Sequence, residues 1–145
     1  MRHMSNKILN MHYNQHIRII GEKVILVPYR RYHVAKYHKW MLSRELQNLT
    51  ASEPLTLEEE YEMQKSWHED NNKCTFIILD KKHFQNCDNE VESMVGDTNL
   101  FFLHEDSRIT AEAEIMIAES KVRGSGFGWE AVVLMLLFGI NYLGL

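Results

Sequence analysis

The sequence predicts one α+β domain with a mixed α/β layout, in which helices are stacked on a largely antiparallel sheet. Its 145 residues, of which 45% are apolar and 25% charged, are typical of one globular domain that buries a core. Short β-branched segments alternate with segments of helical period. Their order along the chain is a strand, two helices, three strands and a last helix, which favours a meander with helices packed on it.

The first strand and the first helix are predicted over residues 23–27 and 34–41. The strand segment is β-branched and ends at Pro28, which cannot donate to a central strand ladder. Apolar residues then recur with helical spacing from Val34 to Met41.

A second helix is predicted from Thr56 through Trp67, after a break at residues 52–54. Thr56 and Glu59 have the spacing of a capping box. In that motif the threonine oxygen accepts from the backbone N–H of residue 59, and the glutamate reaches back to the N–H of residue 56.

Three strands in a meander are predicted over residues 73–79, 94–103 and 111–118, with a polar connection between the first two. Gly96, inside the second of these strands, indicates a bulge or a close backbone approach. The last helix is predicted over residues 127–142.

The segment KVRGSGFGWEA (121–131) places glycine at 124, 126 and 128, where a strand leads into a helix. The first N–H groups of a helix lack intrahelical partners and form the positive end of its dipole, so an anion is stabilised there. Glycine allows unusual backbone conformations and removes the Cβ atoms that would keep a phosphate from the amides. We predict a phosphate cradle over residues 123–128, with Lys121 and Arg123 beside it. A turn without a ligand is the alternative.

Two familiar phosphate loops do not fit this segment. A Walker loop ends in Lys-Ser or Lys-Thr, whereas residues 128–130 are Gly-Trp-Glu. The dinucleotide fingerprint requires GxGxxG, whereas the spacing here is GxGxG. A nucleotide triphosphatase and a Rossmann enzyme are therefore disfavoured.

Arg123, Gly126 and Gly128 fill the pattern Gln/Arg-x-x-Gly-x-Gly/Ala, which resembles motif A of the GCN5-related N-acetyltransferase (GNAT) superfamily. Residues 18–145 resemble, more specifically, the N-acetyltransferase 9 family. The segments that carry this likeness are GEKVILVPY (21–29), YHKWM (37–41), ELQNLTASEPLTLEEEYEMQKSW (45–67), KCTFI (73–77), MVGDTNLF (94–101) and EIMIAES (114–120).

The resemblance implies a GNAT-like fold and the transfer of an acetyl group from acetyl-CoA to a protein amine. An N-terminal α-amine is expected, with tubulin N-termini as the substrate that the resemblance suggests. In such folds the strand before the loop pairs with the pantetheine arm like an added strand, which implies Met116, Ile117 and Ala118 here. The pyrophosphate is assigned to the loop residues Arg123, Gly124, Ser125, Gly126, Phe127 and Gly128.

Acetyl transfer requires a base for the amine and a donor for the developing oxyanion. Glu112 and Glu114 alternate onto the same side of their strand as Met116. Glu114 resembles in position the strand glutamate that serves as base in several acetyltransferases, and it is the candidate catalytic residue. The alternative is that both carboxylates mark a solvated strand face.

Several other classes of function are disfavoured. The net charge of −4 is spread without a basic stripe, so nucleic-acid binding is not expected. The longest apolar run, residues 131–140, is too short to cross a bilayer. Two cysteines are too few for a disulfide framework, which favours a cytoplasmic location. No histidine pair has ligand spacing on a helix, so no metal is expected, and His33 and His38 are expected to be solvated.

The ends of the chain carry two further expectations. Residues 1–17 are predicted to be a poorly ordered N-terminal extension, and residues 18–145 an incomplete GNAT domain. The GNAT fold continues after the loop helix with a strand, a helix and a hairpin that are missing here, so part of the apolar segment 131–140 would face water. The alternative function is a catalytically inactive half-domain that binds a protein through its sheet edge and last helix.

Overall fold

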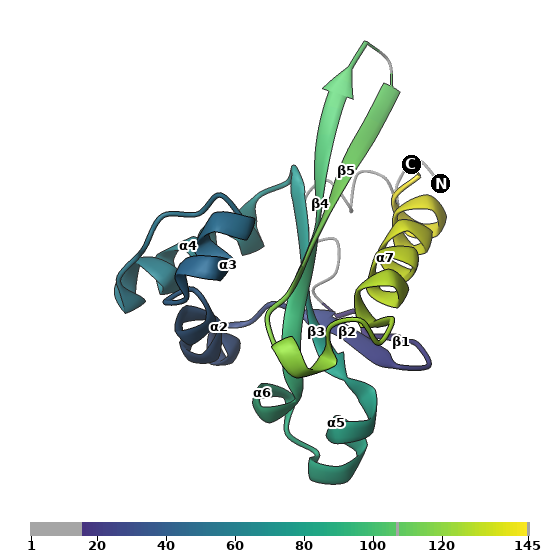
Figure 1. Cartoon of the computed structure of the whole chain (residues 1–145). Coiled ribbons are helices and arrows are strands. Elements are labelled where there is room, and N and C mark those ends of the chain that lie inside the picture. The colour runs from purple at the N-terminus through teal and green to yellow at the C-terminus, as the bar shows by residue number, and fades with distance from the viewer. Residues whose placement is uncertain (1–15, 107, 145) are drawn as a thin grey trace.

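A five-stranded antiparallel sheet forms the middle of three layers (Figure 1). The computed structural model describes residues 16–106 and 108–144. In the sheet the strands follow their order in the chain: β1 (Ile19–Ile20), β2 (Val24–Pro28), β3 (Lys73–Asp80), β4 (Met94–Glu105) and β5 (Arg108–Ile117). The helices are α2 (Val34–Trp40), α3 (Arg44–Leu49), α4 (Leu57–Glu69), α5 (Lys81–Cys87), α6 (Glu90–Ser93) and α7 (Phe127–Leu143), with short 3-10 turns at Arg31–His33 and Ser120–Val122.

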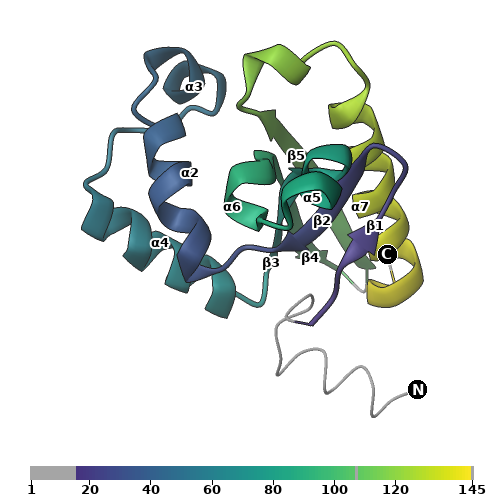
Figure 2. The same ribbon diagram turned by 90° about the horizontal axis from the view of Figure 1, so that it is seen from below.

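Helices cover both faces of the sheet. The helices α2, α3 and α4 lie on one side and α7 lies on the other, as Figures 1 and 2 show. Side-chain alternation in β3 divides the core accordingly. Ile77 and Leu79 pack in a cluster with residues of α2, whereas Phe76 and Ile78 pack with Met135 and its neighbours on α7.

The predicted meander and capping box are confirmed. The strands β3, β4 and β5 pair antiparallel in sequence order. The Thr56 hydroxyl accepts from the Glu59 N–H at 3.1 Å, and the Glu59 carboxylate accepts from the Thr56 N–H at 2.9 Å. These two hydrogen bonds cap the first turn of α4, which begins at the position that the sequence predicts.

Gly96 has both properties that its place in a strand predicted. The pairing of β3 with β4 shifts between Ile78 and Leu79, which face Gly96 and Met94 respectively, so Val95 forms the bulge. A Cβ atom on Gly96 would lie 2.0 Å from the carbonyl oxygen of Met116, so the backbones approach there too closely for any side chain.

Four short elements were missed by the sequence analysis. Strand β1 precedes the first predicted strand, and α3 follows the first predicted helix. The polar connection after β3 is folded into α5 and α6, whose first N–H groups are capped by Asp80 and Asn89. Segments this short are stabilised by caps and packing rather than by a periodic apolar face, so periodicity does not reveal them.

The expectation that His33 is solvated is wrong. Its side chain is fully buried, with Nδ1 accepting from the Arg30 N–H at 3.0 Å and Nε2 lying 2.9 Å from a carboxylate oxygen of Glu90. Because Nδ1 is an acceptor, Nε2 carries the proton and donates to Glu90. The partner is remote in sequence, and local spacing therefore gave no sign of it.

Helix α7 is buried on one side and exposed on the other. Ala131, Met135 and Phe138 pack against the sheet, whereas Leu137 and Ile140 have exposed fractions of 48% and 57%. Within the described residues, no helix combines the length and apolarity needed to cross a membrane. Most of the predicted extension 1–17 lies outside the described residues, but Ile17 packs partly buried against the α7 side of the core.

Candidate active site

The glycine segment forms an open loop at the start of α7. Gly124 and Gly126 have φ angles of +78° and +89°, which L side chains rarely adopt, and Gly126 is the N-cap of α7. A Cβ atom on Gly124 would meet nothing within 4 Å. The loop therefore presents bare backbone at the positive end of a 17-residue helix.

Arg123 is directed toward the protein backbone in this structure. Its Nε donates to the carbonyl of Ile117 at 2.9 Å, and its two terminal nitrogens donate to Ala118 and to the carboxylate of Glu45. These contacts fix the bend between the end of β5 and the glycine loop. The sequence analysis placed Arg123 beside a phosphate, and these contacts give its guanidinium a role in shaping the loop as well.

A different cation reaches the loop from the first hairpin. Lys23 Nζ donates to the carbonyl of Ser125 at 2.8 Å, although 102 positions separate the two residues. The Glu130 carboxylate, in the first turn of α7, accepts from the N–H groups of Lys23 and Val24, both at 2.8 Å. These three bonds join the beginning of β2 to the beginning of α7.

A pocket of about 500 Å³ opens beside this loop. Its lining includes Ser125 and Phe127 from the loop, Lys23 from the first hairpin, and Lys82 and His83 from α5. The same lining holds the carboxylates of Glu22 and Asp80, so the two lysines do not give the pocket a net positive charge. The start of α7 is the feature of this region that favours phosphate groups.

Strand β5 carries two of the residues predicted to contact pantetheine and has one open edge. It is the last strand in the order of the described sheet, and its other edge pairs with β4. Met116 and Ile117 lie at its end, and the Ala118 N–H donates to Val95. An extended ligand can therefore align along the outer edge of β5 and reach the glycine loop.

A second pocket, of about 400 Å³, lies on the sheet face covered by α2 and α4. Glu114 and Met116 of β5 both line it, so the predicted orientation of Glu114 is confirmed. The loop 49–52 supplies one wall, and the aromatic side chains of Tyr37 and Trp67 supply others. Glu114 itself is exposed.

Asp97, in β4, is the carboxylate that the sequence analysis missed. It lines the same pocket with an exposed fraction of only 4%. Its Oδ2 accepts from the Asn99 amide at 3.2 Å and from the Tyr37 hydroxyl at 3.4 Å. Burial raises the pKa of Asp97 to about 6, although the hydrogen bond from Asn99 and the charge of Lys73 act in the opposite direction.

Lys73 introduces a buried ammonium group near Asp97. Its Nζ lies 4.0 Å from the ring centroid of Trp67 and 3.8 Å from that of Phe101, a cation–π arrangement on both sides. Burial lowers the pKa of Lys73 to about 8, while the charges of Asp97 and Glu114 raise it. A carboxylate and a lysine at buried positions of neighbouring strands were the sequence signal for this site, because unpaired buried charges are rare.

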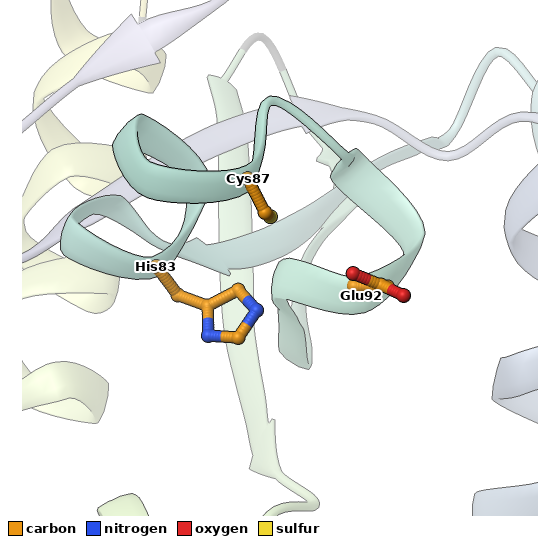
Figure 3. Close-up of side chains that lie close together, drawn as sticks. All are labelled: His83, Cys87 and Glu92. Atoms are coloured by element: carbon orange, nitrogen blue, oxygen red, sulfur yellow. The ribbon is translucent and has the colours of Figure 1, made fainter.

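A separate group of side chains could hold a metal ion (Figure 3). His83 and Cys87 lie four residues apart on α5 and Glu92 lies on α6, and their possible ligand atoms are within 4.8 Å of one another. The sequence analysis considered only pairs of histidines, and so it overlooked this His-Cys spacing.

Comparison with known proteins identifies the family. The protein-family model of the acetyltransferase (GNAT) domain matches residues 23–145 of this chain. The chain belongs to the GNAT acetyltransferase family. This GNAT domain is 59% identical over 131 residues to the alpha/beta-tubulin-N-acetyltransferase 9 of Drosophila melanogaster, covering 88% of this chain and 65% of that protein.

The human protein of the same name is 53% identical to the GNAT domain over 138 residues, covering 93% of this chain and 67% of the relative. The chain thus spans about two thirds of the length of these relatives. A solved structure described as a putative ribosomal-protein-serine acetyltransferase, from Vibrio cholerae, matches with a TM-score of 0.69 and 14% identity, covering 91% of this chain and 71% of that one. At this identity the match supports the fold alone. The predicted family and fold class are confirmed.

Proposed function

We propose that this GNAT domain transfers the acetyl group of acetyl-CoA to the α-amine at the N-terminus of a protein. One observation carries the proposal: the open glycine loop at the start of α7 and the polar pocket on the α2 side lie at the same end of β5. The loop suits a diphosphate and the pocket suits an amine. A thioester whose chain follows the outer edge of β5 would join the two.

The residues fit coenzyme A at the level of backbone and charge. Gly124 and Gly126 keep Cβ atoms away from the loop amides, which can then donate to phosphate oxygens. Ser125, Phe127 and Gly128 supply the remaining amides of the cradle. Lys23 and Lys82, in the adjoining pocket, can donate to the other phosphate of the cofactor, beside the carboxylates of Glu22 and Asp80.

The choice of an α-amine follows from proton chemistry. An α-ammonium group has a reference pKa of about 8, compared with about 10.4 for lysine, so it needs a weaker base at neutral pH. Asp97 and Glu114 are the carboxylates of the pocket. Both favour a cation there, and either can take up its proton.

Tubulin is the proposed protein substrate. Two relatives, 59% and 53% identical to this chain, are named alpha/beta-tubulin-N-acetyltransferase 9. A cytoplasmic location follows from that substrate, and it agrees with the free thiols of Cys74 and Cys87.

Acetyl-CoA binding and peptide acetylation test the proposal separately. We expect millimolar acetyl-CoA to raise the melting temperature of the purified chain, because a ligand that binds only the folded state stabilises it. We also expect mass spectrometry to detect one added acetyl group on a β-tubulin N-terminal peptide, and none on the same peptide with a blocked α-amine. Binding without acetylation would favour the inactive binding module. The absence of both acetyl-CoA binding and peptide acetylation would refute the proposed function.

A further inference from the structure

We propose that Asp97 is the catalytic base of this domain and that Glu114 holds the acceptor ammonium group by its charge. The inference rests on the proposed function and adds the roles of the two pocket carboxylates. They lie on neighbouring strands, where Asp97 faces Met116 and Glu114 faces Asn99 in the register of β4 with β5.

The position of Asp97 fits a group that must meet the reacting atoms. It is directly opposite Met116, one of the residues at the end of β5 along which the thioester is expected to lie. The adjacent Gly96 allows the backbones of β4 and β5 to approach closely. The distance between the Asp97 carboxylate and the thioester path is therefore set by two rigid strands rather than by a loop.

Hydrogen bonds orient the Asp97 carboxylate. Among the described residues, the Tyr37 hydroxyl and the Asn99 amide both donate to Oδ2. Asn99 is itself held, because its amide oxygen accepts from the Thr75 hydroxyl at 2.5 Å. Because Oδ2 already accepts from two donors, we assign Oδ1 as the oxygen that receives the proton.

The surrounding charges suit a base that works near neutral pH. Burial shifts the pKa of Asp97 to about 6. This value is closer to the pKa of an α-amine than the pKa of an ordinary aspartate is. Other titratable groups act electrostatically on Asp97 from α2, β3, β5 and the residue after β2. They are Tyr37, Lys73, Glu114 and Tyr29, and Glu60 of α4 acts on the two tyrosines.

Glu114 is placed for a different task. It lines the same pocket but is exposed, so its charge meets an incoming ammonium group at the mouth of the pocket rather than among buried groups. Its negative charge, together with that of Asp97, exceeds the single positive charge of Lys73 in the pocket lining. An incoming ammonium group is attracted by this imbalance, and we expect Glu114 to affect binding more than proton transfer.

The proposed reaction balances in atoms and charge. The ammonium group passes one proton to Asp97 Oδ1, and the freed lone pair of its nitrogen forms a C–N bond with the thioester carbonyl carbon. The C–S bond breaks, the nitrogen loses a second proton, and the coenzyme A sulfur gains one. Asp97 then releases its proton to water, so that an ammonium ion and a thioester give an amide, a thiol and one solvated proton.

The test compares Asp97→Asn with Glu114→Gln, both nearly isosteric, on the full 145-residue chain. For Asp97→Asn we expect kcat/KM with a β-tubulin N-terminal peptide to fall by about 100-fold or more, and its decline at acidic pH, centred near 6, to disappear. Acetyl-CoA affinity should stay within about threefold of the wild-type value. For Glu114→Gln we expect the peptide KM to rise and the acidic limb to persist. Persistence of that limb in Asp97→Asn, or its loss in Glu114→Gln alone, would overturn the assignment.

A binding measurement keeps the assignment testable if turnover is too slow to measure. Trp67 lines the pocket, so its fluorescence can report peptide occupancy. Asp97→Asn should weaken the peptide with a free α-amine by at least about tenfold and leave the Nα-acetylated peptide unaffected. Equal weakening of both peptides, or of neither, would contradict contact between Asp97 and the amine. Failure of acetyl-CoA binding in the wild type would refute the proposed function instead, and circular dichroism identifies a variant that has not folded.

Discussion

The carbonyl oxygen of Met116 occupies the space that a Cβ atom of Gly96 would need, at a distance of 2.0 Å. This contact joins β4 to β5 one residue before Asp97 and next to the end of the strand that leads to the glycine loop. The close pairing of β4, which carries Asp97, with β5, which carries Glu114, therefore requires a residue without a side chain at position 96.

Gly96→Ala is expected to destabilise the fold by about 1–3 kcal/mol or more, because the methyl group must displace backbone rather than a flexible side chain. Chemical denaturation measures the loss. Gly128→Ala is the control, since its Cβ atom would contact Ile117 at an ordinary 3.5 Å. Equal stability of the two variants would show that the strands can separate without cost.

Gly126→Ala is expected to weaken acetyl-CoA binding by about tenfold or more, because a Cβ atom favours a negative φ and would lie 2.8 Å from Lys23 Nζ. Calorimetric titration with acetyl-CoA measures the change. Gly144→Ala is the matched control, since Gly144 has a φ of +74° but lies at the other end of α7. It should lose stability without losing affinity, and parallel losses of affinity in both would argue against the cradle.

Glu130→Ala is expected to lower the free energy of unfolding by about 2–4 kcal/mol, because it leaves the N–H groups of Lys23 and Val24 without their shared acceptor. Glu130→Gln retains an oxygen in the same place and should cost less than about 1 kcal/mol. Urea unfolding curves of both variants test the difference. If the two substitutions cost the same, the charge of Glu130 matters more than its two hydrogen bonds.

The hydrogen bond from His33, with smaller help from Tyr32 and Arg18, lowers the pKa of Glu90 below its usual range. A carboxylate with a lowered pKa in the folded state stabilises the fold above its unfolded pKa, about 4.3, and loses this effect as the pH falls through its folded pKa. Acidification below about pH 4 should therefore destabilise the wild type more than Glu90→Gln. Parallel melting-temperature profiles of the two proteins in acid would contradict this.

Asp97 has the opposite dependence, because burial raises its pKa to about 6. Its contribution to stability is present below its unfolded pKa, about 3.9, and is lost as the pH rises through about 6. Asp97→Asn should therefore be more stable than the wild type at pH 7, by on the order of 2 kcal/mol, and the difference should vanish near pH 4. A destabilised variant at pH 7 would mean that the ionised form is better satisfied than its burial indicates.

The predictions made from local patterns were confirmed where the feature depends only on residues close together in the sequence. The capping box of Thr56 depends on residues three apart, and the side of β5 on which Glu114 lies depends on alternation alone. The unusual backbone of Gly124 and Gly126 follows from the absence of a side chain. Such features need no knowledge of distant neighbours.

The prediction that failed concerns a partner far away in sequence. His33 was expected in water and is buried against Glu90, 57 positions later. The side chain was correctly recognised as polar, but its partner was decided by packing. The place of Arg123 beside a phosphate stays a prediction, and its guanidinium also contacts the end of β5 and Glu45.

The sequence by itself determined the family, the order of the main strands and helices, and the place of the glycine loop, because these follow from periodicity and from residue types at fixed spacing. Only the tertiary structure decided which charges are buried together. Asp97 and Lys73 share a pocket with Glu114 because three strands and three helices bring them there, and burial then shifts the pKa values of Asp97 and Lys73. Solvation is a property of the assembled fold, so charged residues within strands could indicate a site but not the pKa values of its groups.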